Sequence, residues 1–267
     1  MRRIRLIIEY DGTDYAGWQR QDNAMTVQQR VEEAVARLTG ERVTVTGASR
    51  TDAGVHALGQ CAHFDTQSRI PAEKFAFALN TQLPPDIRVR GSFEADPAFH
   101  ARFEACAKIY RYQIFEGPHH SALLRRTHAH AYYPLDAGLM DREVQAVVGE
   151  HDFAAFAASG SVVKDTVRRM YAARVVRRGP EVTLLIGGKG FLYNMVRIVA
   201  GTIIQVGSGK LPAGAISRAL ADGSRLSLGI TAPPEGLTLT RVFYPSDIDG
   251  FDSYFSDCER LYGGLNV

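Results

Sequence analysis

Residues 47–57, Gly-Ala-Ser-Arg-Thr-Asp-Ala-Gly-Val-His-Ala, interrupt two strand-like runs with polar and turn-forming residues that no strand requires. Polar and apolar residues alternate in the flanking runs, 42–48 and 58–65, as they do in strands with one buried face. Asp52 stands at the centre of the interruption. We therefore expect Asp52 at the tip of a loop that a sheet presents.

Asp52 has a structural and a functional interpretation. Asp side chains bond nearby backbone amides in turns, and Gly54 can supply the positive φ that a tight turn needs. Loops on rigid scaffolds also carry catalytic groups, although most loops are only turns. The spacing alone favours the turn.

Composition narrows the class of protein. With 267 residues, 45% hydrophobic and 22% charged, the chain can bury a sizeable core. Cys61, Cys106 and Cys258 have neither zinc-ligand nor disulfide spacing, so we expect free thiols in a reducing cytosol. Too few apolar residues follow the basic start for a signal peptide, which predicts a cytoplasmic protein.

The net charge of +2 is too small to indicate a nucleic-acid partner by itself. Its distribution says more. Five acidic residues and one arginine give residues 246–267 a charge of −4, so residues 1–245 carry +6. The body of the chain is basic and its tail is acidic.

The periodic segments predict an α+β protein. The order up to about residue 104 is β-α-β-β-α-β, and the second half repeats it, which implies two split βαβ (ferredoxin-like) halves with mostly antiparallel sheets. We expect domains at 1–104 and 105–267, with the functional site in the central groove where the halves meet. The predicted strands are 3–10, 42–48, 58–65, 86–95, 104–116, 166–177, 181–188 and 237–244, and the predicted helices are 26–39, 71–83, 136–149, 191–206 and 212–221.

The strand at 104–116 places Lys108, Tyr110 and Tyr112 on one face. Interleaved cations and aromatic rings suit nucleic acid, because bases stack on rings while cations meet phosphates. Tyrosine is also a common strand former at sheet surfaces, and the pattern alone favours that explanation.

The segment 191–206 is apolar nearly all round, which indicates a buried helix with Arg197 as its only charge. An unpaired buried charge is too costly, so Arg197 must reach the rim or find an anion. We prefer a carboxylate partner.

Residues 50–57, Arg-Thr-Asp-Ala-Gly-Val-His-Ala, resemble the signature of the tRNA pseudouridine synthase A family, and the similarity extends from Glu9 to Pro245. The resemblance implies isomerisation of uridine to pseudouridine in the anticodon stem-loop of tRNA (positions 38–40), inside an RNA-binding cleft and without a metal or organic cofactor. It also implies a homodimer that contacts no membrane.

The resemblance assigns roles residue by residue. Asp52 matches the catalytic nucleophile, and Arg197, within Met-Val-Arg, matches the arginine that pairs with it. Tyr110 matches the tyrosine that stacks on the uracil, and Arg50 matches the residue that helps to turn the base out of its helix. Arg20, Arg102 and Leu237 lie in family-like contexts, the arginines as phosphate contacts and the leucine as an apolar wall of the site.

Two departures from the family pattern bear on the site. Ser49 stands where the family usually has Gly, and Thr238 stands where Tyr is common. Ser49 could narrow the backbone freedom beside Asp52, while Thr238 removes an aromatic ring near the pocket. Neither change removes a chemical role.

Three other interpretations remain open. His128 and His130 would share one strand face, but no carboxylate or thiolate pair at ligand spacing supports a metal site. A tRNA-binding module without catalysis would keep the basic, aromatic surface. A hydrolase with a carboxylate nucleophile would keep Asp52.

Overall fold

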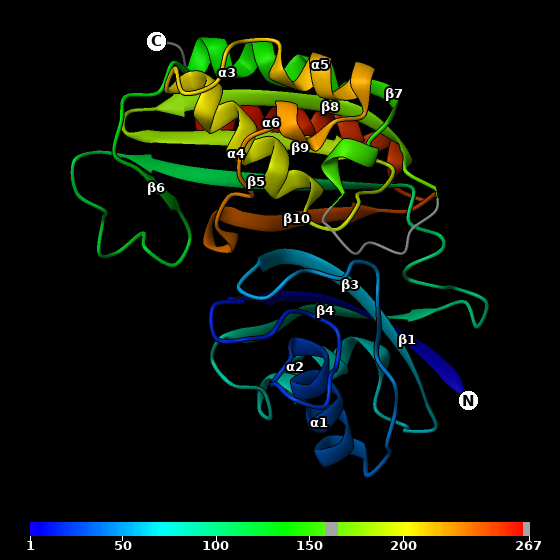
Figure 1. The fold of residues 1–267 in the computed structure, drawn as a ribbon. Coiled ribbons are helices and arrows are strands. Elements are labelled where there is room, and N and C mark those ends of the chain that lie inside the picture. Colours follow the sequence, from blue (N-terminus) through cyan, green and yellow to red (C-terminus); the bar gives the residue numbers. More distant parts are fainter. Residues whose placement is uncertain (158–164, 264–267) are drawn as a thin grey trace. The chain divides into compact units, whose positions relative to one another are not determined.

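The computed structural model describes residues 1–157 and 165–263. The chain forms two compact units (Figure 1). Unit 1 contains residues 1–106 and 238–245, and unit 2 contains residues 107–237 and 246–267. The segment 238–245, which follows the whole of the second half in sequence, therefore completes the first unit.

Unit 1 is a mixed α+β unit in which α1 and α2 pack together beside a mostly antiparallel sheet. The strands run in the order β4-β1-β3-β10, with β2 also on β3, and the β10–β3 pair is the parallel one. Its elements are β1 (Arg2–Tyr10), α1 (Val27–Thr39), β2 (Thr46–Gly47), β3 (His56–Thr66), α2 (Phe75–Asn80), β4 (Ile87–Ala95) and β10 (Leu237–Phe243).

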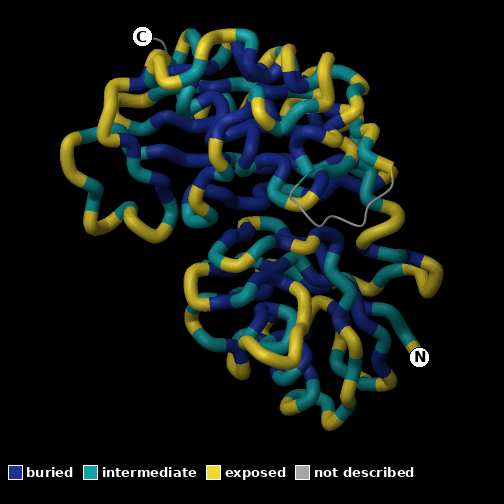
Figure 2. The backbone as a smooth tube through the Cα atoms, in the orientation of Figure 1, coloured by how far each residue is buried: buried dark blue, intermediate teal, exposed yellow. Residues whose placement is uncertain are grey.

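The strand β1 has the alternation that its sequence predicts. Ile4, Leu6, Ile8 and Tyr10 are buried, while the residues between them are half-buried. Because successive side chains point to opposite faces, one face of β1 joins the core that Figure 2 shows in dark blue.

The helix α1 begins and ends where its capping residues predict. Thr26 accepts a hydrogen bond from the Gln29 backbone nitrogen at 3.3 Å, and Gly40 ends the helix in the left-handed region with φ 75°. Thr26 and Gln29 have the spacing of a capping box, but the box is only half formed, because the Gln29 side chain donates to Glu33 at 2.9 Å.

Unit 2 also mixes helices with a mostly antiparallel sheet, whose order is β5-β9-β8-β7 with β6 parallel to β5. Figure 1 shows α3, α4 and α5 on one side of this sheet and α6 on the other. The elements are β5 (Ala107–Glu116), β6 (Ala129–Ala131), α3 (Ala137–Val144), β7 (Gly149–Asp152), β8 (Val167–Arg178), β9 (Glu181–Gly188), α4 (Met195–Gly207), α5 (Ala215–Asp222) and α6 (Phe251–Gly263).

Four predicted elements differ from the structure. The helix expected at 136–149 is the shorter α3 followed by a 3₁₀ turn, Gln145–Val147, and the strand β7 begins at Gly149. The strand expected at 42–48 is reduced to β2, because the backbone nitrogen of Val45 bonds to the Glu32 carboxylate at 3.0 Å instead of to a neighbouring strand. The helix expected at 71–83 is a 3₁₀ turn, Ala72–Lys74, followed by the short α2. The helix expected from 191 begins at Met195, because Asn194 is left-handed with φ 61°.

The acidic tail, for which no element was predicted, forms α6. Its apolar face buries Phe251, Phe255 and Cys258 against β8 and β9. Asp252 and Asp257 are exposed, while the half-buried Glu259 pairs with Arg174 of β8 at 3.2 Å. The three cysteines are free thiols, as expected. Across residues 1–157 and 165–263, no helix is long and apolar enough to cross a membrane.

Candidate active site

The loop that carries Asp52 is held through its backbone. The Gln60 side chain, which is fully buried, accepts from the Ser49 nitrogen at 3.1 Å and donates to the Ser49 oxygen at 2.6 Å. After the loop tip, the Val55 nitrogen bonds to the Asp52 oxygen at 3.1 Å and closes a turn. Gly54 has φ 77°, as the turn requires.

A second loop, residues 11–18 after β1, packs directly against the first. A Cβ atom added to Gly12 would lie 2.0 Å from the Val55 oxygen, and one added to Gly17 would lie 2.5 Å from the Thr51 oxygen. Gly17 also has φ 91°, a conformation that side chains disfavour. Only glycine permits this close approach of the two backbones.

Hydrogen bonds join the same two loops. The Tyr10 and Thr51 hydroxyls lie 2.8 Å apart, and the Trp18 nitrogen donates to the Thr51 oxygen at 3.1 Å. Trp18 is 2% exposed, so its side chain packs in the core. The Asp52 backbone is thus fixed from several sides while its side chain is half-buried.

His56, the first residue of β3, contacts the loop 11–18 through its side chain. The Nδ1 atom of His56 accepts a hydrogen bond from the Gly12 nitrogen at 3.0 Å and lies 3.2 Å from Oδ1 of Asp11. Thr238, the residue in place of the family's tyrosine, is buried and pairs with His56 across the β10–β3 ladder.

Ser49 is compatible with the loop backbone. Among residues 1–157 and 165–263, Asn194 is the one non-glycine residue with positive φ. Ser49 therefore adds no left-handed strain beside Asp52.

The predicted RNA-contacting arginines of unit 1 differ in their surroundings. The Arg50 side chain is exposed, and within the described parts of the chain it makes no ion pair or hydrogen bond. Arg20 instead pairs with Glu32 of α1 at 2.9 Å, with about half of its side chain exposed. Arg50 can meet a phosphate without breaking an existing contact, whereas Arg20 shares its charge with a carboxylate.

Arg102 lies elsewhere in unit 1. It is exposed on a loop that contacts His63, near the far end of β3. At ~3.3 Å per strand residue, the length of β3 from His56 to His63 separates this loop from the Asp52 loop by about 20 Å. Its guanidinium lies over the Phe103 ring at 5.7 Å. The structure therefore does not bring Arg102 next to Asp52.

In unit 2, the predicted residues gather around residues 232–237. The Arg197 Nε donates to the Ala232 oxygen at 2.8 Å, and its Nη1 donates to the Asn194 side chain at 2.9 Å. The Tyr112 hydroxyl donates to the Pro233 oxygen at 2.8 Å. The segment thus links β5 to α4, and burial raises the pKa of Tyr112, which keeps its hydroxyl protonated.

Tyr110 and Leu237 belong to the same region and are both 6% exposed. The Tyr110 ring meets the Phe191 ring edge-to-face at 5.0 Å, next to the start of α4. The left-handed Asn194, whose side chain binds Arg197, fixes where α4 begins and therefore where Arg197 points. Sequence periodicity gave no signal of this arrangement.

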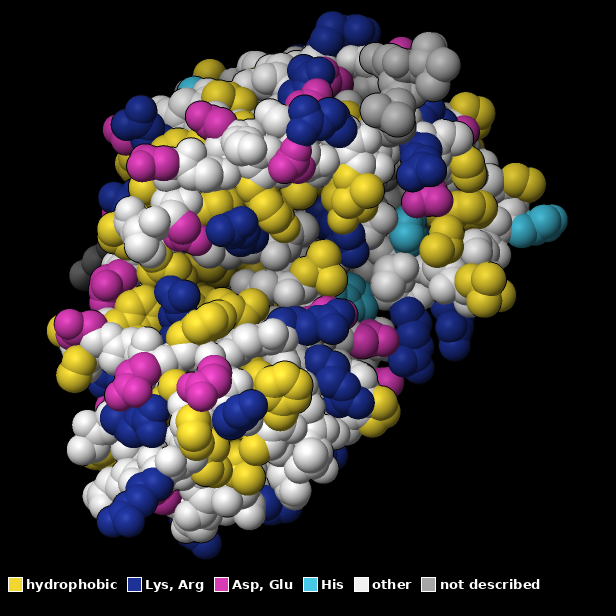
Figure 3. All heavy atoms as spheres, turned by 180° about the vertical axis from the view of Figure 1, so that it is seen from behind, with side chains coloured by type: hydrophobic (Ala, Val, Ile, Leu, Met, Phe, Trp, Pro, Cys, Tyr) yellow, Lys and Arg dark blue, Asp and Glu magenta, His cyan; other side chains and the backbone are white. Residues whose placement is uncertain are grey.

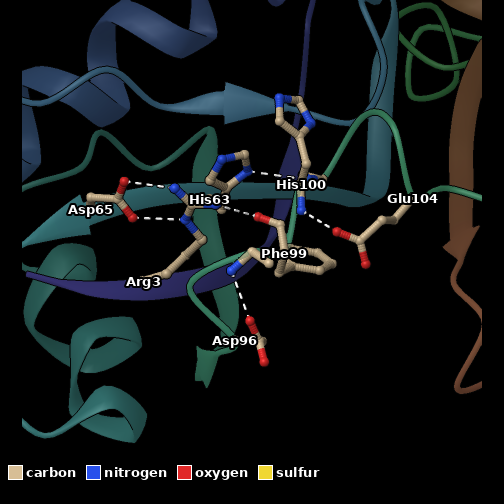
Figure 4. A network of polar contacts seen from close by, with 9 residues as sticks. Arg3, His63, Asp65, Asp96, Phe99, His100 and Glu104 are labelled. Atoms are coloured by element: carbon tan, nitrogen blue, oxygen red, sulfur yellow. Dashed lines mark hydrogen bonds and ion pairs between the residues drawn. The ribbon is translucent and has the colours of Figure 1, made fainter.

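A polar cluster at the far end of β3 was missed by the sequence analysis (Figure 4). Arg3 binds both oxygens of Asp65, at 2.7 Å each, and also the Phe99 oxygen at 2.7 Å. His63 is buried, and its Nδ1 accepts from the Ala101 nitrogen at 3.2 Å. Alternating charges in the paired strands, Arg3 opposite Asp65, were the available signal.

The cluster shifts two pKa values in ways that suit a structural role. Burial, together with the nearby Arg3 and His100, lowers the pKa of His63 from 6.5 to about 4. The hydrogen bonds from Arg3 lower the pKa of Asp65. At neutral pH the imidazole is therefore an uncharged acceptor, and Asp65 is a carboxylate that Arg3 already engages.

The geometry offers no metal centre within residues 1–157 and 165–263, because no three His, Cys, Asp or Glu side chains converge there. His128 is buried, and burial lowers its pKa. His130 bonds to the Gly117 oxygen at 2.8 Å. These histidines are explained by local hydrogen bonds.

The fold and the loop define a class: a mixed α+β protein that presents a half-buried carboxylate on a rigid loop beside an exposed arginine. A family model described as tRNA pseudouridine synthase matches residues 6–104 and 144–245. The chain belongs to this family, which is a family of isomerases.

Curated relatives agree over nearly the whole chain. A protein named tRNA pseudouridine synthase A from Ruminiclostridium cellulolyticum is 49% identical over 91% of this chain and 100% of its own length. Proteins of the same name from Acetivibrio thermocellus and Geotalea daltonii are 50% and 48% identical, also over 91% of this chain and all of their own length.

Solved structures give a more distant match. A chain in a Cbf5-Nop10-Gar1 complex matches 96% of this chain at 12% identity with a TM-score of 0.35. A chain in an archaeal box H/ACA sRNP Nop10-Cbf5 complex matches the same share with a TM-score of 0.37. This protein spans 57% of each of those chains.

Proposed function

We propose that this protein isomerises uridine to pseudouridine in the anticodon stem-loop of tRNA, with Asp52 as the nucleophile. The observation that carries the proposal is the fixed loop around Asp52, whose backbone Gln60, Gly12 and Gly17 hold in place. A nucleophile needs such a fixed position, because small displacements of a reacting group slow a reaction strongly. Family membership supplies the reaction class.

The proposed chemistry uses only the carboxylate and the substrate. Asp52 attacks either carbon 6 of the uracil or the anomeric carbon of the ribose, and the glycosidic bond to nitrogen 1 breaks. The base then turns and rejoins the ribose through carbon 5. Carbon 5 gives up its proton, nitrogen 1 gains one, and Asp52 leaves as a carboxylate. The steps balance without a metal or an organic cofactor.

The other residues are proposed to position the substrate and the nucleophile. A stacked base must leave its helix before a carboxylate can reach it, and the exposed Arg50 suits that step. Tyr110 would stack on the uracil and Leu237 would form an apolar wall. Arg197 would keep Asp52 ionised, because a nearby cation lowers the pKa of a carboxylate. Arg20 and Arg102 would contact phosphates.

The finer description of the fold belongs to the same proposal. In unit 1 the order β4-β1-β3, with β2 on β3 and α-helices following β1 and β3, supports a split βαβ arrangement. We propose the same arrangement for the second half, with RNA bound in the central cleft of the family.

We propose a cytoplasmic homodimer as the working unit. The chain has a net charge of only +2, while tRNA is a large polyanion. Two copies of the chain would offer it a larger basic surface than one. Light scattering at working concentration should give the mass of two chains. A monomeric mass with full activity would rule the dimer out.

A product assay separates the three candidate activities. Incubation with unmodified transcript tRNA should yield pseudouridine, detected by mass spectrometry of the digested RNA after derivatisation. Release of free uracil would indicate the hydrolase, and tight binding without either product would indicate a binding module.

The coupling of Arg197 to Asp52 can be tested through pH. Arg197→Met keeps most of the side-chain volume but removes the charge, so the pKa of Asp52 should rise and the acidic limb of the pH–rate profile should move to higher pH. An unmoved acidic limb would show that the two residues are not coupled.

A further inference from the structure

Residues 117–134, which join β5 to α3, form a basic, aromatic loop that the proposed chemistry does not use. Figure 1 shows the segment between β5 and β6 as a long excursion from the sheet of unit 2. The loop contains two arginines, four histidines and two tyrosines, and no carboxylate. The composition favours an anionic partner.

Rings from the loop and from β5 form a cluster. The His120 and His130 rings are stacked at 4.7 Å with an interplanar angle of 16°. Phe115 lies 6.3 Å from His120 and 6.4 Å from His130, so these three rings form a triangle. The Tyr132 ring packs on His130 at 4.0 Å with an angle of 53°, and 68% of its surface is exposed.

Strand pairing and a hydrogen bond hold the ring cluster in place. The β6 strand pairs with β5 in parallel, and His130 bonds to the Gly117 oxygen at 2.8 Å. Within the described residues, the buried Nδ1 of His120 has no hydrogen-bond partner, so stacking sets the position of this ring. A fixed ring costs less entropy to use in binding than a mobile one.

The neighbouring tyrosine differs from Tyr132. Tyr133 is exposed to a similar degree, 53%, but the Lys210 ammonium lies 3.8 Å from the centre of its ring. One face of Tyr133 is therefore occupied by a cation of the protein itself. The two adjacent tyrosines form a matched pair, in which Tyr132 packs on a histidine of the ring cluster and Tyr133 packs on a lysine.

The same loop carries cations. Arg125 is exposed, and its Nη1 donates to the Ala122 oxygen at 3.4 Å. In Figure 3, exposed histidine side chains stand beside hydrophobic and basic ones. Aromatic rings next to cations are the combination with which proteins bind single-stranded RNA, because the rings stack on bases and the cations meet phosphates.

We propose that the loop 117–134 is an RNA-binding subsite in which an unpaired base stacks on Tyr132 and Arg125 contacts a phosphate. The inference rests on the proposed function, since it takes tRNA as the RNA. It adds a contact that is separate from the chemistry at Asp52 and contributes to binding, not to the reaction step.

Fluorescence tests the stack directly. Trp18 is the only tryptophan of the chain, so the emission that Tyr132→Trp adds, measured as the difference from wild type, reports on position 132. Adding unmodified tRNA transcript should quench this indole, because a stacked base quenches its emission. The matched variant Tyr133→Trp should be quenched much less. Equal quenching at both positions, or none at position 132, would overturn the proposal.

Affinity supplies the second readout. Tyr132→Leu keeps an apolar side chain but removes the ring, and it should weaken tRNA binding at least about fivefold, whereas Tyr133→Leu should change it less than twofold. Arg125→Gln should lower the slope of log affinity against log salt by about one. If Tyr132→Leu unfolds at lower temperature than wild type, the quenching result decides.

Two controls separate this proposal from others. Pseudouridine formation at saturating enzyme should be the same in wild type and Tyr132→Leu. If wild type forms no pseudouridine, the proposed function fails while the stacking result stands by itself. A change in the light-scattering mass of Tyr132→Leu would identify the loop as a contact between two copies of the chain and overturn the RNA proposal.

Discussion

The two ends of β3 make the same kind of contact with a neighbouring loop. At each end a buried histidine accepts a hydrogen bond from the backbone of a neighbouring loop: His56 from Gly12 at 3.0 Å, and His63 from Ala101 at 3.2 Å. Each end also has an aspartate nearby, Asp52 before the strand and Asp65 within it.

The two aspartates lie in different kinds of structure. Arg3 engages both oxygens of Asp65, which lies within a paired strand and belongs to a polar cluster (Figure 4). Asp52 lies in a turn whose backbone packs closely against the loop 11–18. The predictions below test whether the first aspartate serves the fold and the second the reaction.

Exchange of each aspartate for asparagine should have the largest effect and separate the two roles. Asp52→Asn should lower single-turnover pseudouridine formation at least about a thousandfold while tRNA binding survives, because an amide cannot act as the nucleophile. Asp65→Asn, the matched control, should leave the rate within a few fold and cost about 1 kcal/mol of unfolding free energy. An Asp52→Asn rate within tenfold of wild type would remove Asp52 from the mechanism.

Glycine exchange should test the fixed backbone. Gly17→Ala and Gly40→Ala both put alanine at positive φ, which costs roughly 1–2 kcal/mol, but only at Gly17 would the new Cβ meet another backbone, at 2.5 Å from the Thr51 oxygen. We expect Gly17→Ala to lower kcat by about ten- to a hundredfold through displacement of Asp52. Gly40→Ala should change kcat less than twofold, with stability measured for both by urea unfolding. Equal kcat values would show that the close approach does not position the loop.

The smallest effect concerns the far end of β3 and appears in stability. The pKa of His63 falls from 6.5 unfolded to about 4 folded, so the unfolded chain binds the proton more tightly. Below about pH 6.5 wild type should therefore lose stability, by up to about 2 kcal/mol at pH 4.5.

His63→Gln isolates this contribution, because a glutamine oxygen can accept the Ala101 hydrogen bond but does not titrate. Denaturant unfolding from pH 7 to 4.5 should show a shallower pH dependence in the variant than in wild type. Parallel curves would mean that His63 is protonated without penalty in the folded protein.

Local sequence was sufficient for the elements whose boundaries depend on near neighbours. The caps of α1, the alternation of β1 and the bounds of β9 follow from residues within a few positions of each boundary. The motif around Asp52 likewise identified the candidate nucleophile and the family, because eight consecutive residues carry a specific match.

Tertiary structure decided what depends on residues far apart in the chain. Glu32 takes the backbone nitrogen of Val45 and shortens the strand expected at 42–48. The segment 238–245 joins unit 1 because β10 pairs with β3, about 180 residues earlier in the sequence. Gly12 and Gly17 are required by the approach of another loop, which neither residue's neighbours encode. Periodicity and capping report only on neighbours along the chain, whereas these features arise when distant backbones compete for the same hydrogen bonds and the same space.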